Sequence, residues 1–243
     1  MNDVEEIAKN ILMYVPHELR TPLVSISGFS QLLTENYYSL SGDEVYEMAH
    51  RIKVNSRRLF RIIEKFITLS DLICLTEKSK KDDLIRNDNV ADAANAVKAI
   101  TLVKAKEFNR RDDLIFDLCD SCVFIGEEYL EKLVSEIMEN ALKFSLEGTP
   151  VEVKSEVKND AYTISIKDYG IGMTADQISR INAFMQFGRE IYHQDGNGLG
   201  LIIAKKIAEL YGGSFEIRSE RSFYTSVTIS LKTVKINNID SKR

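Results

Sequence analysis

Residues 136–145 read EIMENALKFS and close a segment, 127–144, whose apolar spacing predicts an α-helix. Glu136, Asn140 and Lys143 follow one another at intervals of four and three residues, so they share one face of that helix. A carboxylate, an amide oxygen and an ammonium group on one face can hold Mg²⁺ together with a polyphosphate. Taken alone, such a run is more often an ordinary solvated charged surface.

A second motif, DYGIGM (168–173), follows a run at 162–166 that alternation and β-branched residues predict to be a strand. It places Asp168 at the strand end, where a carboxylate can accept a hydrogen bond from an exocyclic amine. Gly170 and Gly172 let the backbone approach a flat ligand closely. The alternative is a simple tight turn, which a D-x-G sequence forms anyway.

A third motif, GNGLGL (196–201), leads into a helix predicted over 199–210. A glycine-rich loop before a helix offers backbone N–H groups and a positive dipole end to phosphate. No strand leads directly into the motif and no βαβ unit surrounds it, so it is not the dinucleotide fingerprint. It also lacks the G-K-[ST] of a P-loop. By itself this motif is weak.

The order and spacing of these motifs resemble those of histidine-kinase ATP-binding domains, which belong to the Bergerat-fold group shared with gyrase-like and chaperone ATPases. EIMENALKFS is similar to the N box, DYGIGM to the G1 box, FMQFGRE (184–190) to the F box and GNGLGL to the G2 box. The resemblance covers about 110–232. It implies an α/β two-layer sandwich that binds ATP and Mg²⁺.

The resemblance also implies roles for residues around the adenine and over the nucleotide. Asp168 is expected to read the adenine amine, with Gly170 and Gly172 giving close approach. A lid is expected over 173–197. The other nucleotide-binding residues implied in the lid and the glycine loop are Phe187, Gly196, Gly198, Leu199 and Gly200.

On the phosphate side, Asn140 is expected to ligate Mg²⁺ together with Glu136, and Lys143 to touch phosphate. Two features depart from the family pattern. Glu136 stands where many histidine kinases have Asn and where gyrase-like ATPases use Glu to activate water. The glycine-containing segment before the last strand is replaced by RSFYT (221–225), which bears on any adenine contact from Thr225 or Thr228.

The first 76 residues have the pattern of two long helices with a heptad seam. The expected seam residues are Leu19, Leu23, Ile26, Phe29 (or Ser30) and Leu33, then Met48, Ile52, Asn55, Leu59, Ile62, Phe66, Leu69 and Ile73. A capping box from Ser41 to Glu44 predicts a hairpin that closes near 39–42. Two copies can bury the seam as a four-helix bundle, which predicts a homodimer. The alternative is packing on the chain's own second domain.

On the first helix, HELRTPL (17–23) resembles the H box of the dimerisation and phosphotransfer domain. A lone histidine on an amphipathic helix is usually packed or on the surface, but here the resemblance makes His17 the expected phospho-acceptor, since neutral imidazole is a competent nucleophile near pH 7. Glu18 can orient the ring and take up its proton. The H-E-x-x-T pattern in similar kinases also supports dephosphorylation of the partner regulator, which implies that Thr21, one turn from His17, positions water. Pro22 is expected to bend the helix.

Composition limits the remaining possibilities. The chain has 243 residues and a formal net charge of −5, with Lys and Arg interleaved among Asp and Glu, which argues against nucleic acid. No run is long and apolar enough for a membrane span. The pair Cys119 and Cys122 lacks the partners that a zinc site needs, and ordinary thiols are expected in a reducing cytoplasm. Sixteen residues precede His17, so the signal is expected from an upstream segment or a partner.

The sequence therefore predicts an α+β chain: a dimerisation and phosphotransfer domain at 1–76, a linker at 77–88 and a catalytic ATP-binding domain at 89–235. We expect a sensor histidine kinase core that autophosphorylates His17 from Mg-ATP and passes the phosphoryl group to an aspartate of a response-regulator receiver domain. Phosphatase activity is also expected. The alternatives are a phosphatase or phosphotransfer module with weak kinase activity, or a gyrase-like ATP hydrolase.

Overall fold

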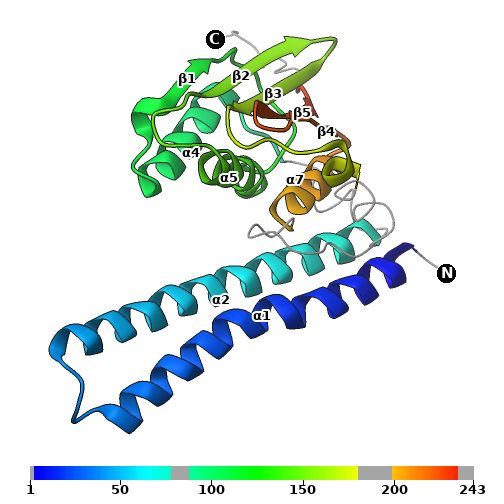
Figure 1. The fold of residues 1–243 in the computed structure, drawn as a ribbon. Coiled ribbons are helices and arrows are strands. Elements are labelled where there is room, and N and C mark those ends of the chain that lie inside the picture. The colour runs from blue at the N-terminus through cyan, green and yellow to red at the C-terminus, as the bar shows by residue number, and fades with distance from the viewer. Residues whose placement is uncertain (1–2, 78–87, 180–198, 235–243) are drawn as a thin grey trace, which may run out of the picture. The chain divides into compact units, whose positions relative to one another are not determined.

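The computed structural model describes residues 3–77, 88–179 and 199–234 (Figure 1). The chain divides into two compact units, a helical hairpin up to Ser70 and a unit built around a sheet. Most of the predicted linker, 77–88, lies outside the described residues, so the domain boundaries stay predictions. Among the helices of the described residues, none is both long and apolar enough to cross a membrane.

The hairpin consists of α1 (Asp3–Asn36) and α2 (Gly42–Glu77), joined by a loop at 37–41. The predicted capping box begins α2. Ser41 N–H donates to Glu44 Oε2 at 2.8 Å, and Glu44 N–H donates to Ser41 Oγ at 3.3 Å. These two bonds satisfy N–H groups that a helix start otherwise leaves without partners, which fixes where the second helix begins.

The seam predicted on α2 is the less exposed face of that helix, with Ile62 and Leu69 buried. On α1, Leu23 is 55% exposed in the single chain, whereas Pro22 is buried. Pro22 lies three residues after Leu19 and four before Ile26, so it continues the same stripe with correct helical spacing. Within one hairpin the compact apolar ring of Pro22 therefore lies on the buried stripe, and the place of Leu23 in a seam between two hairpins stays a prediction.

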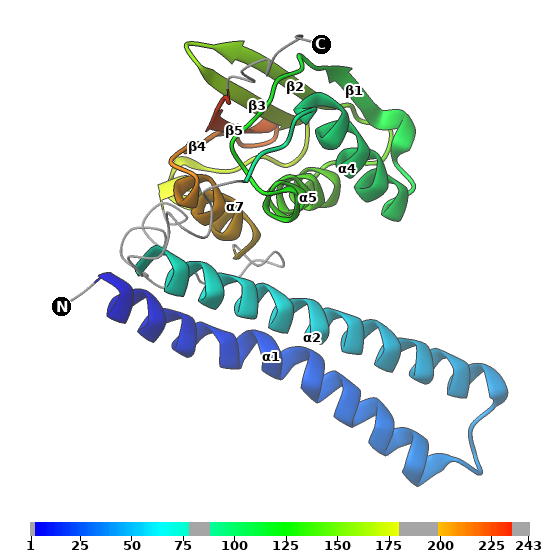
Figure 2. The same ribbon diagram turned by 180° about the vertical axis from the view of Figure 1, so that it is seen from behind.

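The second unit is a two-layer α/β sandwich, as predicted. Its five-stranded sheet has the order β1-β2-β3-β5-β4, with β1 and β2 parallel and the other neighbours antiparallel. Helices α4, α5 and α7 lie on one face of the sheet in both views (Figures 1 and 2). The elements are α4 (Ala93–Glu107), the short 3₁₀ helix η1 (Arg111–Asp113), β1 (Leu114–Asp117), α5 (Glu127–Phe144), β2 (Val151–Lys158), β3 (Ala161–Asp168), α7 (Leu199–Leu210), β4 (Ser214–Glu220) and β5 (Tyr224–Lys232).

Strand β3 runs through the middle of this sheet and carries the alternation AYTISIKD. Tyr162, Ile164 and Ile166 point to the helical layer and are buried. Because side chains alternate along a strand, the same period places Asp168 on the buried face at the strand end. The apolar pattern that forms the core therefore also delivers a carboxylate into it.

The run Cys122–Ile125 forms no strand, although its composition is β-rich. Val123 makes only isolated bridges, to Val90 and Thr233, and Phe124 N–H donates to the Lys232 carbonyl. The chain must then turn at once into α5, which has Gly126 as its N-cap. This segment therefore pairs with its neighbours through a single residue, Val123, and forms no extended strand.

Candidate nucleotide-binding site

Asp168 is the buried carboxylate of this site. Its side chain is 4% exposed, and Oδ1 accepts the N–H of Gly170 at 3.0 Å. On the sheet it lies between Val151 and Thr225. Burial raises the pKa of Asp168 to about 6, because the charged form loses hydration, while the Gly170 N–H and the charge of Arg110 oppose that rise. Near pH 7 the group is an ionised acceptor held in a dry position.

The glycine loop after Asp168 docks on the end of α5. Ile171 N–H donates to the carbonyl of Phe144 at 3.0 Å. A Cβ placed on Gly170 would collide with that same carbonyl, so only glycine permits this approach. The second and first motifs of the sequence therefore meet through one backbone oxygen.

The tip of the β4–β5 hairpin holds the loop from the other side. Ser222 N–H donates to the Ile171 carbonyl at 2.7 Å, and Met173 N–H donates to Ser219 Oγ at 2.7 Å. Gly172 has a φ of +58°, and a Cβ there would meet the carbonyl of Glu220. The loop is thus held by hydrogen bonds at Ile171 and Met173. The close backbone of Glu220 leaves no room for a side chain at position 172.

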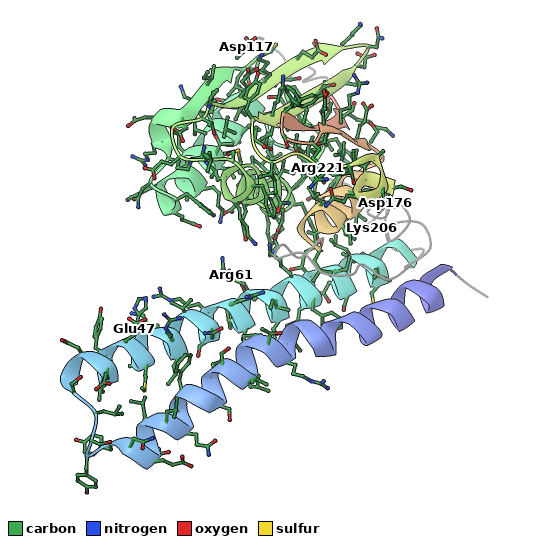
Figure 3. The ribbon with its side chains drawn as sticks, in the orientation of Figure 1. Glu47, Arg61, Asp117, Asp176, Lys206 and Arg221 are labelled. Atoms are coloured by element: carbon green, nitrogen blue, oxygen red, sulfur yellow. The ribbon has the colours of Figure 1, made fainter. Side chains whose placement is uncertain are left out.

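RSFYT, which departs from the family pattern, forms this hairpin tip. Residues 221–223 make the turn, Ser222 adopts a φ of +66° without being glycine, and Arg221 marks the tip in Figure 3. Thr225 pairs with Asp168, and its Oγ1 is 3.0 Å from Ser219 Oγ. Thr228 pairs with Ser165, so strand alternation points its side chain to the opposite face from Thr225. Of the two threonines, Thr225 is the one on the side of the site.

The phosphate-side residues gather where α5 meets the start of α7. A Cβ on Gly200 would lie 2.5 Å from Glu136 Oε2 and 3.6 Å from Asn140 Nδ2. Glu136 is 5% exposed. The third motif and the first motif are therefore in contact, because Gly200 at the start of α7 packs beside the carboxylate of Glu136 and the amide of Asn140. Leu199, at the start of α7, is buried, with 2% of the residue exposed.

Lys143 lies one turn further along α5 and is exposed. Its Nζ is 5.2 Å from the centroid of the Phe144 ring. The cation therefore lies over the residue whose carbonyl receives the glycine loop. On α5, Glu136, Asn140 and Lys143 keep the order along one face that their spacing predicts.

Several predicted residues lie outside the described part of the structure. Phe187, Gly196 and Gly198 are among them, as is the lid from 180 onward. The described start of the lid is a helical turn at 175–179, where Thr174 and Gln177 form a reciprocal cap; Asp176 on this turn is labelled in Figure 3. Of the acceptor residues, His17 and Glu18 lie on α1 with their side chains outside the described part, and Thr21 is exposed.

Sequence reasoning missed Arg110, which lies between α4 and β1 and is 4% exposed. Its guanidinium forms an ion pair with Asp113 at 2.6 Å and donates to the carbonyls of Leu142 and Ser145 at the end of α5. No signal in the sequence marks it, because it stands in the charged run NRRDD, which has the composition of a solvated loop.

Two family profiles match the chain. Residues 126–235 match the histidine kinase-, DNA gyrase B- and HSP90-like ATPase family, and residues 8–73 match the His Kinase A (phospho-acceptor) domain. The two profiles together span well over half of the chain, in the order of the two units. The chain is a catalytic core of the two-component histidine kinase family. The motif resemblance noted in the sequence is thereby confirmed.

Relatives of this histidine kinase core agree with that assignment. It is 28% identical to the sensor histidine kinase YvrG of Bacillus subtilis over 89% of this chain and 37% of the relative. It is 30% identical to the histidine protein kinase SaeS of Staphylococcus epidermidis over 91% of this chain and 62% of the relative. The histidine kinase AdeS of Acinetobacter baumannii has the same fold, with a TM-score of 0.63 and 20% identity over 89% of this chain and 97% of that chain. The kinase core spans less than half the length of several curated relatives it matches.

The raised pKa of Asp168 predicts a specific pH dependence of stability without nucleotide. A folded-state pKa near 6, against 3.8 for the ordinary group, means that protonation favours the fold. The stability contribution is fully present below pH 3.8 and is lost as the pH rises through 6. Asp168→Asn, which cannot ionise, should therefore exceed the wild type in unfolding free energy by about 3 kcal/mol at pH 8, and the excess should shrink toward pH 4.

Urea unfolding at several pH values measures this difference. Asp117→Asn, at an exposed position on β1, is the matched control and should show no such pH-dependent gain. A stability difference between Asp168→Asn and the wild type that stays constant from pH 4 to pH 8 would contradict the assignment.

Proposed function

We propose that this chain is an ATP-dependent autokinase that phosphorylates His17 and then passes the phosphoryl group to an aspartate of a response-regulator receiver domain. The contact of Gly200 with Glu136 and Asn140 carries the proposal on the donor side. It brings a helix N-terminus, where N–H groups favour anions, to the face of α5 that carries the polar residues. Together with the Asp168 loop, this makes a site with an adenine end and a phosphate end.

The chain's own residues position the donor. The ionised Asp168 accepts a hydrogen bond from the exocyclic amine of adenine. The glycine loop, which is held by Phe144 and the hairpin tip, lets the adenine ring lie against the backbone. Lys143 supplies a cation near the end of α5. Phosphoryl transfer depends mainly on orienting the reactants and on neutralising charge, so fixed backbone amides and the Lys143 ammonium group are suited to it.

Magnesium fits the donor groups that this site offers. An amide oxygen from Asn140 and a carboxylate from Glu136 are hard oxygen ligands on one helix face, and Gly200 brings the phosphate-facing helix start to both. When bound, Mg²⁺ would neutralise part of the polyphosphate charge. Asn140 and Glu136 would hold the ion.

At the acceptor, an imidazole nitrogen of His17 attacks the γ-phosphorus of ATP. The new N–P bond forms as the bond from that phosphorus to the bridging oxygen breaks, and ADP leaves. Glu18 takes the proton of the imidazole and holds the ring in the reactive tautomer. Thr21 is exposed one turn along α1. We expect its hydroxyl to orient the water that hydrolyses the phosphorylated regulator.

A homodimer through the hairpin completes the proposal. Two helices bury one seam and leave further large apolar side chains on the surface of the hairpin. These are Leu23, Val24, Leu32, Val54, Phe60, Ile63 and Ile67, all at least 40% exposed. Exposed apolar residues in this number indicate a protein partner, and a second hairpin would bury them in a four-helix bundle.

The autokinase proposal predicts acid-labile label on His17. Incubating the chain with Mg²⁺ and ATP labelled at the γ-phosphate should label the wild type and His50→Ala, whose histidine lies on α2, and should not label His17→Ala. Phosphoramidates hydrolyse in acid, so brief acid treatment should release the label. Release of free phosphate without labelled protein would instead indicate the gyrase-like hydrolase.

The phosphatase role predicts a separation of activities at Thr21. Thr21→Ala should keep autophosphorylation within about threefold of the wild type, because the hydroxyl takes no part in attack by the imidazole. Dephosphorylation of the receiver domain that the kinase labels most rapidly should slow by about 100-fold or more, the lower end of the range for a positioned general acid or base. Thr34→Ala, exposed near the end of the same helix, is the control. Equal dephosphorylation rates in Thr21→Ala and the wild type would remove the phosphatase role from Thr21.

A further inference from the structure

Arg110 is a buried charge whose donors are directed at the end of α5. Nε donates to Asp113 Oδ2 at 2.6 Å. Nη1 donates to the carbonyl of Leu142 at 2.7 Å and to the carbonyl and hydroxyl of Ser145 at 3.0 and 2.9 Å. Nη2 donates to the carbonyl of Thr149 at 3.0 Å. One side chain thus ties together η1, the last turn of α5 and the loop that follows it.

The physical reason for an arginine here lies in the helix end. The last carbonyls of a helix have no partners within it, and they carry the negative end of the helix dipole. A guanidinium is planar and offers its donors in a fixed fork, so it can satisfy several such carbonyls at set angles. A lysine ammonium has the same charge but a single nitrogen, and it cannot span Leu142, Ser145 and Thr149 together.

The carbonyls that Arg110 binds lie on either side, along the chain, of the Phe144 carbonyl on which the glycine loop docks. Arg110 binds the carbonyls of Leu142 and Ser145, and Phe144 lies between them in the chain. The Phe144 carbonyl accepts Ile171 N–H at 3.0 Å and leaves room only for glycine at 170. The position of that carbonyl, and hence of the whole turn from Asp168 to Met173, therefore depends on how the last turn of α5 is held.

Electrostatics connects the same two groups. The positive charge of Arg110 acts to lower the pKa of the Asp168 carboxyl, in opposition to the desolvation that raises it. The guanidinium thus favours the ionised form of the residue that faces the adenine amine. Geometry and charge act in the same direction.

We propose that Arg110 is a positioning residue for ATP, setting the place of the Phe144 carbonyl on which the adenine-reading loop docks. The inference rests on the proposed role of residues 168–173 in binding adenine. Arg110 touches no reacting atom in this account and acts only through α5. Its loss should therefore weaken ATP binding more than it slows the chemical step.

The test compares Arg110→Lys with Arg111→Lys, a matched change at the exposed neighbouring arginine. Arg110→Met is added to remove the charge, and Arg110→Lys keeps the test valid if the methionine variant does not fold. KM for ATP and kcat of autophosphorylation are measured in the full chain, with kcat referred to the folded fraction. We expect Arg110→Lys to raise KM at least about tenfold with kcat within about threefold, and Arg111→Lys to change neither.

Hydrogen exchange at the Ile171 amide gives a readout that a purely stabilising role would not move. We expect faster exchange of this amide in Arg110→Lys, under conditions where buried amides of β3 exchange as in the wild type. A lowered melting temperature with unchanged KM and unchanged Ile171 exchange would overturn the inference. Failure of the wild type itself to bind ATP would overturn the proposed function, so the two failures are distinct.

Discussion

The hydrogen bond from Ile171 N–H to the Phe144 carbonyl joins the parts of the nucleotide-binding unit that the sequence keeps apart. It attaches the loop after β3 to the end of α5, and the β4–β5 hairpin closes over the same loop through Ser222. Because glycine alone fits beside that carbonyl, the loop has little freedom to settle elsewhere. The proposed recognition of adenine by Asp168 and the proposed role of Arg110 both depend on this junction.

The junction places a carboxylate where folding alone would not put one. Asp168 occupies a core position at the end of an apolar strand, and its burial opposes ionisation near neutral pH. An apolar residue at that position would serve the fold better, so the cost is understandable only if the charge has a task. A fixed, dehydrated acceptor needs no reorganisation when an amine arrives, and this is the advantage that such a site offers.

Much of this arrangement was predictable from sequence because its signals are local. The helices at 127–144 and 199–210 were predicted with the ends that the structure has, since apolar spacing and flanking glycines define both. The isolated bridges of Val123 and the burial of Pro22 were not predictable, because both depend on tertiary neighbours. Arg110 was missed for the same reason, because the sequence does not distinguish a buried arginine from a solvated one and only the tertiary packing does.

The most direct measurement compares the binding of ATP with that of inosine triphosphate, which carries a carbonyl oxygen in place of the exocyclic amine of adenine. If the ionised Asp168 accepts a hydrogen bond from that amine, the wild type should bind ATP at least about 100-fold more tightly than inosine triphosphate, because the carbonyl oxygen of inosine would face a buried carboxylate. In Asp168→Asn, whose amide can donate as well as accept, the preference should fall to within about tenfold. Equal affinity of the wild type for the two nucleotides would contradict the account.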